Sequence, residues 1–350
     1  MPDWKTRAGR AVLQSVWWSG LSGAAARRAQ PFGAIFTLHH VSPVPLGNFP
    51  PNGHLRIGPD FLDAAIRHLK AKDVDFVDLA EATRRIAAPR QEGDRFFAAF
   101  TLDDGYCNNE AHAAPVFRKY GVPYTVFVSP GLSEGTTLPW WEVIEKVVRD
   151  NDAVRVPFLP DPIPAKTVAE MRRAFNRIFL HLTHECPESY LNGTVRQLAE
   201  RNGVVADKAA TCVMDWAALQ RLSQDPLCTI GAHSMTHARL SRLDSRDVFR
   251  ELQQSRDVIG EKLGQAPDFF AYPYGYREAC GPREFALAAE VGYRAAFTTR
   301  LHALSPRTAS NLHALPRLSL NGYYQNPRFI DVLISGLPGQ WKERRDRYAG

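Results

Sequence analysis

The chain has 350 residues, of which 45% are hydrophobic and 23% are charged. This balance is typical of a folded protein with a sizeable core and excludes a disordered or collagen-like chain. The net charge of +6 is spread along the sequence, and no basic patch is interleaved with aromatic residues. We therefore expect no nucleic-acid partner, while an anionic polymer or surface stays open.

Residues 1–30 are expected to form an N-terminal helical segment. Three basic residues followed by small and apolar ones resemble a signal peptide, but Gln14 and Ser15 interrupt the apolar run. A true signal peptide has a continuous apolar stretch, so we favour an amphipathic or packing helix. On this interpretation the protein is cytoplasmic, and it is periplasmic if the segment is instead cleaved. No stretch approaches the ~18 apolar residues of a membrane span, so none is expected.

The five cysteines are odd in number and show no CxxC spacing. This pattern argues against a disulfide framework in a chain of this length. It indicates a reducing compartment.

Short apolar runs alternate with amphipathic stretches along most of the chain. The runs are continuous rather than alternating, as in strands covered on both faces. We predict strands at 33–41, 95–102, 123–129, 228–234, 268–275 and 293–299, and helices at 60–72, 111–121, 216–224, 245–264 and 283–292. Strands that alternate with helices indicate a parallel sheet, either a barrel or an open doubly wound sheet.

One segment, at about residues 131–210, departs from this rhythm. It holds helical patterns and a proline-rich stretch with little strand signal. We interpret it as a helical insertion within a single domain spanning residues 31–325, followed by a C-terminal helical tail over residues 326–350.

The predicted strand in "FTLDDGY" ends on two adjacent carboxylates, Asp103 and Asp104. One interpretation is a strand that runs into an Asp-Gly turn. The other is a site in which one carboxylate faces a cation and the other handles a proton, because like charges at close range make burial costly.

Two histidines, His233 and His237, stand in "HSMTH" at the end of a later predicted strand. Alone they fit either a pair of ligands or a polar turn. In a parallel barrel, however, the carboxyl ends of the strands share one rim. Two imidazoles and one carboxylate at that rim would form a ligand set with positions left open for water, as catalytic Zn²⁺ sites require.

Taken in order, these motifs resemble those of the polysaccharide deacetylases (NodB-homology proteins, carbohydrate esterase family 4). "TLDDGY" resembles the family's T-F-D-D-G, "HSMTH" its H-[ST]-x-x-H, "FAYPYG" a variant of its third motif, and "LHHV" its Y-H-x-V. The resemblance covers roughly residues 30–320. It implies a deformed (β/α) barrel and metal-dependent removal of acetyl groups from N-acetylated sugars.

Carried over by position, the resemblance makes Asp103 the general base. It makes Asp104, His233 and His237 the ligands of a divalent metal, with Zn²⁺ the expected ion. A backbone N–H near Tyr274 would help to hold the oxyanion.

The sequence departs from the family pattern at two places. Ala271 stands where many relatives have an arginine that orients the base, and no histidine occupies residues 319–321, where the family's fifth motif supplies the general acid. His39 of "LHHV" is our candidate replacement acid, because imidazole titrates near neutrality. His40 is the second candidate for the general acid and His313 the third. The alternative interpretation of "LHHV" is a strand end whose imidazoles face solvent.

Several further residues are candidates for contact with substrate or base. Arg317 would partly replace the missing orienting arginine or bind substrate. Tyr272 and Tyr274 either stack on a sugar ring or belong to the core. Trp140 and Trp141 pose the same choice, and since adjacent helical residues do not share a face, we expect at most one of them to reach the cleft.

The expected activity is therefore N-deacetylation of glycans that contain N-acetylhexosamine. The alternatives are an O-acetyl esterase or another amidase, because the same water activation serves both, and a catalytically impaired glycan-binding relative. The retained carboxylate pair and both histidines argue against impairment, because a binding module needs no base beside a metal ligand.

Overall fold

A sheet of eight parallel strands forms the centre of the molecule in the computed structural model, which describes residues 4–206 and 212–341. Seven strands follow the order β11-β10-β9-β6-β5-β1-β12, and β4 pairs with β5. Their bounds are β1 Gly33–Leu38, β4 Asp75–Phe76, β5 Phe97–Leu102, β6 Tyr124–Val128, β9 Cys228–Ala232, β10 Phe269–Ala271, β11 Ala295–Phe297 and β12 Leu318–Ser319. A separate parallel pair joins β2 (His40–Val41) to β3 (Arg56–Ile57).

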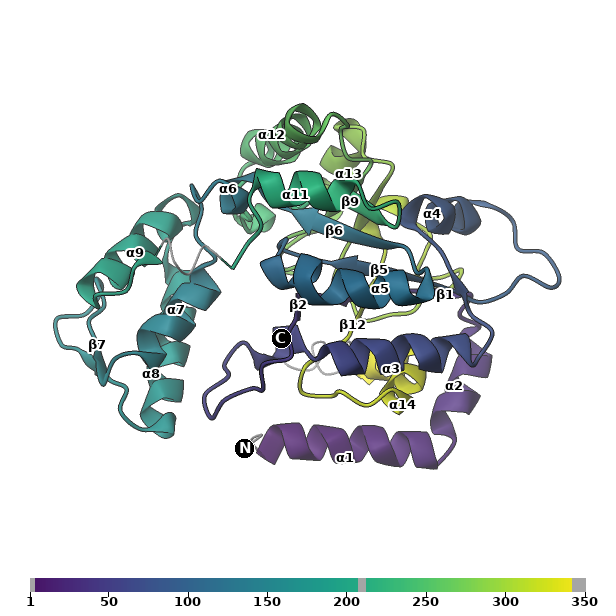
Figure 1. The fold of residues 1–350 in the computed structure, drawn as a ribbon, viewed down its shortest axis with the longest axis horizontal. Helices are drawn as coiled ribbons and strands as arrows, with labels where there is room; N and C mark the ends of the chain where they lie inside the picture. Colours follow the sequence, from purple (N-terminus) through teal and green to yellow (C-terminus); the bar gives the residue numbers. More distant parts are fainter. Residues whose placement is uncertain (1–3, 207–211, 342–350) are drawn as a thin grey trace.

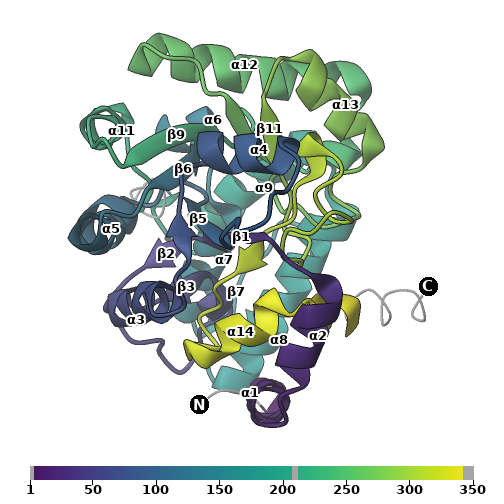
Figure 2. The ribbon, with the colours of Figure 1, turned by 90° about the vertical axis from the view of Figure 1, so that its right-hand side faces the viewer.

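Both faces of this sheet are buried, which explains why its strands are continuous apolar runs. Phe36 and Phe100 point into the layer beneath the helices, whereas their neighbours Ile35 and Phe97 point to the other face, among phenylalanines from β6, β10 and β11. The sheet curls into a half-barrel surrounded by helices (Figures 1 and 2). The deformed (β/α) barrel expected from the sequence is confirmed.

Five of the six helices around the sheet lie close to predicted positions, and α4 is the exception. They are α3 Pro59–Lys70, α4 Leu79–Ala87, α5 Ala114–Tyr120, α11 Trp216–Ser223, α12 Ser245–Leu263 and α13 Pro282–Glu290. Helices α5 and α12 end at Gly121 and Gly264, both in the left-handed conformation that glycine adopts at low cost. The sequence did not predict α4 or the two-residue strands other than β2, which lies within the predicted strand 33–41.

The segment at about 131–210 packs beside the barrel around a core of its own (Figure 1). It contains α6 Pro130–Ser133, α7 Trp140–Arg149, α8 Val168–Leu180 and α9 Glu188–Arg201. An antiparallel pair, β7 Ala153–Val154 with β8 Ile163–Pro164, encloses the proline-rich stretch. Helix α7 buries one face against α8 and α9, so the insertion forms a wall beside the carboxyl ends of the barrel strands.

Residues near the two ends of the described chain pack together below α3 (Figure 2). Helices α1 (Trp4–Trp18) and α2 (Leu21–Ala29) contact α14 (Arg328–Ile334). The guanidinium of Arg328 lies 4.6 Å from the ring of Trp17, whose indole N–H donates to Asp331 at 3.4 Å. Among the described helices, none is long and apolar enough to cross a membrane.

Gly231 in β9 leads directly to the histidine motif and leaves no room for a side chain. A Cβ there would lie 2.4 Å from the ring of Phe127 and 3.2 Å from the carbonyl of Phe269. We expect Gly231→Ala to lower the free energy of unfolding by about 1–3 kcal/mol because it overpacks the barrel interior. Urea denaturation measures the change.

Gly193→Ala is the matched control, because a Cβ at this position of α9 meets open space. It should be neutral or raise the free energy of unfolding by about 0.5–1 kcal/mol, since alanine favours the helix. Equal effects of the two substitutions would contradict the packing argument.

Candidate active site

A cleft of about 590 Å³ opens at the carboxyl ends of the barrel strands. Strand ends β1, β5, β9, β10, β11 and β12 all contribute to its wall, as does the insertion. The lining includes Thr37, His39, Asp103, Asp104, His233, His237, Tyr274, Thr299, Ser319, Trp140 and Trp141. Four of the motifs identified in the sequence therefore meet in one place.

Asp103 is held by Arg317 in a bidentate pair. Nη1 and Nη2 of Arg317 each donate to one carboxylate oxygen of Asp103 at 2.7 Å. Arg317 is fully buried, and it also donates to Thr298 and Thr101. Burial opposes ionisation, but the guanidinium holds the pKa of Asp103 below its usual value, so the carboxylate stays charged.

The structure thus corrects the expectation that Arg317 binds substrate. Its guanidinium is enclosed in the barrel, 5.6 Å from the ring of Phe127, and it does not line the cleft. It orients Asp103 instead, which was the other role considered for it. Ala271, at the place of the family's arginine, leaves this role to a residue that precedes β12.

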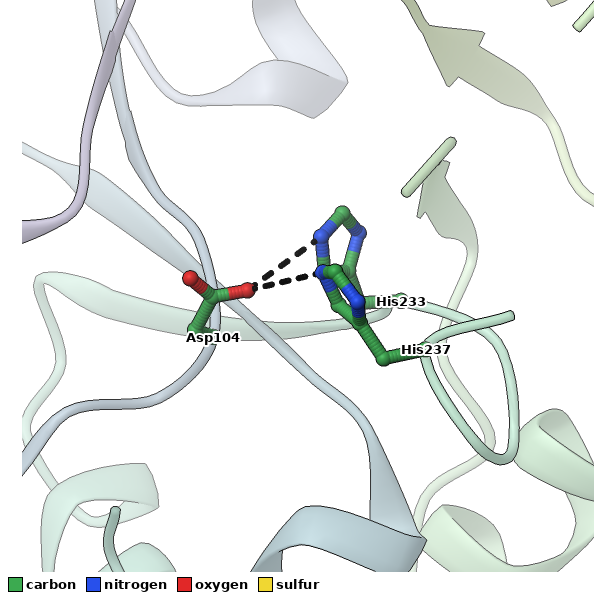
Figure 3. A group of neighbouring side chains, drawn as sticks. All are labelled: Asp104, His233 and His237. Atoms are coloured by element: carbon green, nitrogen blue, oxygen red, sulfur yellow. Dashed lines mark ion pairs between the residues drawn. The ribbon is translucent and has the colours of Figure 1, made fainter. Parts of the chain in front are cut away.

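Asp104, which directly follows Asp103 in the chain, forms a compact group with His233 and His237 (Figure 3). Oδ1 of Asp104 lies 3.5 Å from Nε2 of His233 and 3.2 Å from Nε2 of His237. All three residues are buried, and their ligand atoms lie within 4.8 Å of one another. The group has the size and the donor types of a site for a divalent cation.

Hydrogen bonding within the group shows why it suits a metal. Nδ1 of His233 lies 2.7 Å from the carbonyl of Ala271 and must donate to it, which leaves the lone pair of Nε2 facing Asp104. Burial lowers the pKa of His233 to about 4, so the ring is neutral at pH 7. Oδ1 of Asp104 is buried and has no hydrogen-bond partner among the residues that the structure describes. Two lone pairs that face each other in a dry site are complementary to a cation.

Backbone strain is concentrated around this group. Four of the six non-glycine residues with positive φ among the described residues are Asp104, Ser234, His237 and Tyr274. Such conformations cost about 1–3 kcal/mol each and persist where the surrounding structure requires them. Here they turn the ligand side chains inward from the strand ends.

The three candidate acids occupy different environments. His39 lines the cleft, and its Nε2 lies 4.0 Å from Oδ2 of Asp103. Burial lowers the pKa of His39, against the opposite effect of the two aspartates. The strand that precedes it, β1, pairs with β12, and Thr37 is in register with Ser319, at the place where the family carries its acid. His39 therefore reaches the cleft from the neighbouring strand.

His40 and His313 lie outside the lining of the cleft. The ring of His40 stacks on Tyr106 at 3.5 Å and hydrogen-bonds Glu142 and Asn108. His313 lies 2.8 Å from the carbonyl of Tyr293, through Nε2. The contacts of both rings lie outside the cleft and hold neighbouring segments together.

Aromatic rings cover one wall of the cleft. Trp140 and Trp141, the first two residues of α7, both line it, which corrects the expectation that at most one would. Their rings meet edge to face at 5.7 Å, so two large side chains on adjacent helical positions reach the same space. The indole of Trp140 donates to the hydroxyl of Tyr274 at 3.0 Å, and Trp141 lies 4.7 Å from His237.

Tyr272 and Tyr274 occupy different parts of the structure. Tyr274 lines the cleft, with its ring 5.1 Å from that of His237. Tyr272 is fully buried in the helix-side core, where its hydroxyl donates to the carbonyl of His313 at 2.9 Å. The structure thus corrects the prediction of Tyr272 as a substrate contact, because this side chain packs in the core and does not reach the cleft.

Sequence reasoning missed several residues that line the cleft. Arg239 and Arg242 follow the histidine motif in "HSMTHARLSR". Their position just after this motif could have indicated that they line the cleft. Arg300 and His54 also line the cleft. Arg300 directly follows the predicted strand 293–299, so its place at the rim was available from the sequence, whereas the segment around His54 shows no sign of a site.

Comparison with known proteins agrees with this geometry. Residues 190–296 match the polysaccharide deacetylase family model, over a region that holds His233, His237 and Tyr274 and begins after Asp103. No curated protein matches the chain.

Solved structures share the fold. The Streptococcus pyogenes deacetylase PplD, in complex with acetate, is similar with a TM-score of 0.57 at 16% identity, covering 86% of this chain and 97% of that one. IcaB from Ammonifex degensii is similar with a TM-score of 0.53 at 16% identity, covering 87% and 96%. BC0361, a polysaccharide deacetylase from Bacillus cereus, has a TM-score of 0.51 at 13% identity, covering 86% and 68%.

The family match and the shared fold confirm the relationship to the polysaccharide deacetylases that the motifs indicated. The match supports the prediction of a hydrolase that acts on carbon–nitrogen bonds. The Asp104, His233 and His237 group offers the donor set of a metal site within that framework.

The buried pair of Asp103 and Arg317 yields a stability prediction. Removing one partner strands the other charge in the barrel, so Arg317→Gln should lower the free energy of unfolding by about 3–5 kcal/mol. Asp103→Asn/Arg317→Gln should be less destabilised than Arg317→Gln alone, because neither charge is then left unpaired. Chemical denaturation of the single and double variants completes the cycle, and strictly additive effects would show that the pair is not coupled.

Proposed function

We propose that this protein is a metal-dependent N-deacetylase that hydrolyses acetamido groups of glycans containing N-acetylhexosamine. One observation carries the proposal: an oriented carboxylate, Asp103, stands beside three converging ligands at the base of a cleft. A glycan-binding relative without activity would need neither the oriented base nor the unpartnered carboxylate oxygen of Asp104.

Asp104, His233 and His237 would hold the divalent cation, with Zn²⁺ the expected ion. When bound, it would act as a Lewis acid and lower the pKa of a water molecule. The neutral imidazole of His233, fixed by Ala271, presents the nitrogen lone pair that such an ion requires.

Asp103 accepts the proton of the attacking water in this proposal. Both of its oxygens are fixed by Arg317, and Thr37 lies 3.3 Å from Oδ2, so the carboxylate cannot rotate out of position. A base held in this way loses no orientational freedom during the reaction.

The backbone at Tyr274 supplies a donor for the oxyanion. Tyr274 lines the cleft with a left-handed φ of 63°, and its N–H donates to no group within the described residues. Thr299 fixes the same residue by donating to its carbonyl at 2.7 Å. A preorganised N–H of this kind stabilises negative charge that develops on a carbonyl oxygen.

His39 is the proposed general acid for the leaving amine. It lines the cleft 4.0 Å from Asp103, close to the carboxylate that collects the proton. Trp140, Trp141 and Tyr274 offer apolar faces on which a sugar ring can stack. Cytoplasmic residence remains part of the proposal, and all five cysteines are free thiols.

Acetate release from N-acetylglucosamine oligomers tests the function. We expect release that a chelator abolishes and that added Zn²⁺ or another divalent ion restores.

His237→Ala should lose metal content and activity together, because two ligands hold the ion poorly. Asp103→Asn should keep its metal and lose most turnover, because an amide cannot accept the proton.

Outcomes of that assay separate the alternatives. Release from O-acetylated but not N-acetylated substrates would assign the esterase, and no release from either by metal-loaded protein would assign the binding relative. His237→Ala with stoichiometric metal would remove this residue from the ligand set.

His39→Ala tests the proposed acid. General acid catalysis typically contributes ~10²–10⁴-fold, so kcat should fall by about that factor with metal content intact. His40→Ala, the neighbouring control, should reduce kcat less, because His40 contacts Glu142 and Tyr106 outside the cleft. A wild-type rate in His39→Ala would mean that the proton comes from elsewhere.

A further inference from the structure

Arginines without carboxylate partners line the outer part of the cleft. Arg239, Arg242 and Arg300 all belong to its lining. Each donates to a backbone carbonyl, at Thr183, Cys186 and Cys280 respectively. Within the described parts of the chain, none of these three guanidinium groups forms an ion pair with a carboxylate, whereas the surface arginines Arg250 and Arg294 do.

Two of these side chains also contain a buried nitrogen that lacks a hydrogen-bond partner among the described residues. Nε of Arg239 and Nε of Arg300 are enclosed and have no hydrogen-bond partner within the described chain. A buried donor without a partner is costly, and the rest of each half-exposed guanidinium remains accessible to a ligand. Both arginines are thus held in place by a carbonyl and an aromatic ring, and neither is paired with a carboxylate among the described residues.

Among the described residues, no acidic side chain of the cleft forms an ion pair with these arginines, although Arg239 and Arg242 oppose the rise that burial causes in the pKa of Glu188. Glu188 accepts a hydrogen bond from the backbone N–H of Arg239 at 2.8 Å, not from its guanidinium. Glu278 lies on the exposed rim. Asp103 is paired with Arg317, and Asp104 faces the two histidines.

Arg239 connects to the ligand group through a row of aromatic rings. Tyr274 lies 5.1 Å from His237, Tyr276 lies 6.3 Å from Tyr274, and the guanidinium of Arg239 lies 5.4 Å from the ring of Tyr276. The row leads outward from the reacting centre along the wall of the cleft. A sugar whose acetamido group reaches the metal ligands would extend toward these arginines.

We propose that the outer cleft is a subsite for an anionic group on the substrate, so that the acetylated glycan carries a phosphate or carboxylate near the acetamido sugar. The inference rests on the proposed deacetylase function and names the substrate class for the same site. Guanidinium groups bind both anions through two parallel hydrogen bonds, and such charge-assisted bonds are about twice as strong as neutral ones.

Binding of three probes to the full-length protein tests this subsite without requiring turnover. The probes are N-acetylglucosamine 1-phosphate, a disaccharide of N-acetylglucosamine and glucuronic acid, and neutral di-N-acetylchitobiose. We expect at least one anionic probe to bind roughly tenfold or more tightly than the neutral one, from one or two charge-assisted hydrogen bonds. The anionic probe that binds more tightly than the neutral one identifies phosphate or carboxylate as the anionic group of the substrate.

Arg239→Gln/Arg242→Gln should abolish the preference for the anionic probe. The control Arg172→Gln should retain this preference, because Arg172 is an exposed residue of α8 that does not line the cleft. If the double variant does not fold, raising the ionic strength should weaken binding of the anionic probe to the wild-type protein and leave that of the neutral probe unchanged.

Equal affinity of the wild-type protein for all three probes, or a preference that survives in the double variant, would overturn the proposal. A preference that disappears in the double variant supports it. Because binding is measured separately from acetate release, a protein that binds anionic probes but releases no acetate would refute the proposed function and leave the anionic subsite intact.

Discussion

The ion pair between Arg317 and Asp103 links three neighbouring strands inside the half-barrel. Arg317 precedes β12, Asp103 follows β5, and β1 lies between these strands, with Thr37 contributing a further contact to Asp103. A charge pair at this depth is tolerated because the guanidinium fork satisfies both carboxylate oxygens. The remaining donors of Arg317 bind the hydroxyl of Thr101 and the carbonyl of Thr298. The position of the proposed base therefore depends on the closure of the sheet itself.

The remainder of the site is arranged around that fixed carboxylate. Asp104 follows Asp103 with a positive φ, so the second carboxylate turns away from Arg317 and toward His233 and His237. The two adjacent acids consequently have different partners, a guanidinium for one and two imidazoles for the other. This separation answers the electrostatic objection to placing two carboxylates side by side at the end of a buried strand.

The insertion gives the cleft its particular character. Its tryptophans close one side with apolar rings, and its segment at Thr183 and Cys186 provides the carbonyls that hold Arg239 and Arg242. One wall of the cleft is therefore aromatic near the ligand group and cationic further out. That gradient suits a sugar with an anionic substituent better than a uniformly neutral chain.

Local patterns in the sequence predicted six strands of the parallel sheet, most helices between them and the convergence of Asp103, Asp104, His233 and His237 at one rim, but not β4, β12 or α4. They succeed because burial on both faces produces continuous apolar runs, and parallel strands necessarily bring their carboxyl ends together. Only the tertiary structure decided which face Tyr272 occupies, that both Trp140 and Trp141 reach the cleft, and that Arg317 orients Asp103. Each of these outcomes depends on contacts between residues far apart in the chain, and side-chain packing across such distances leaves no periodic signal in the sequence.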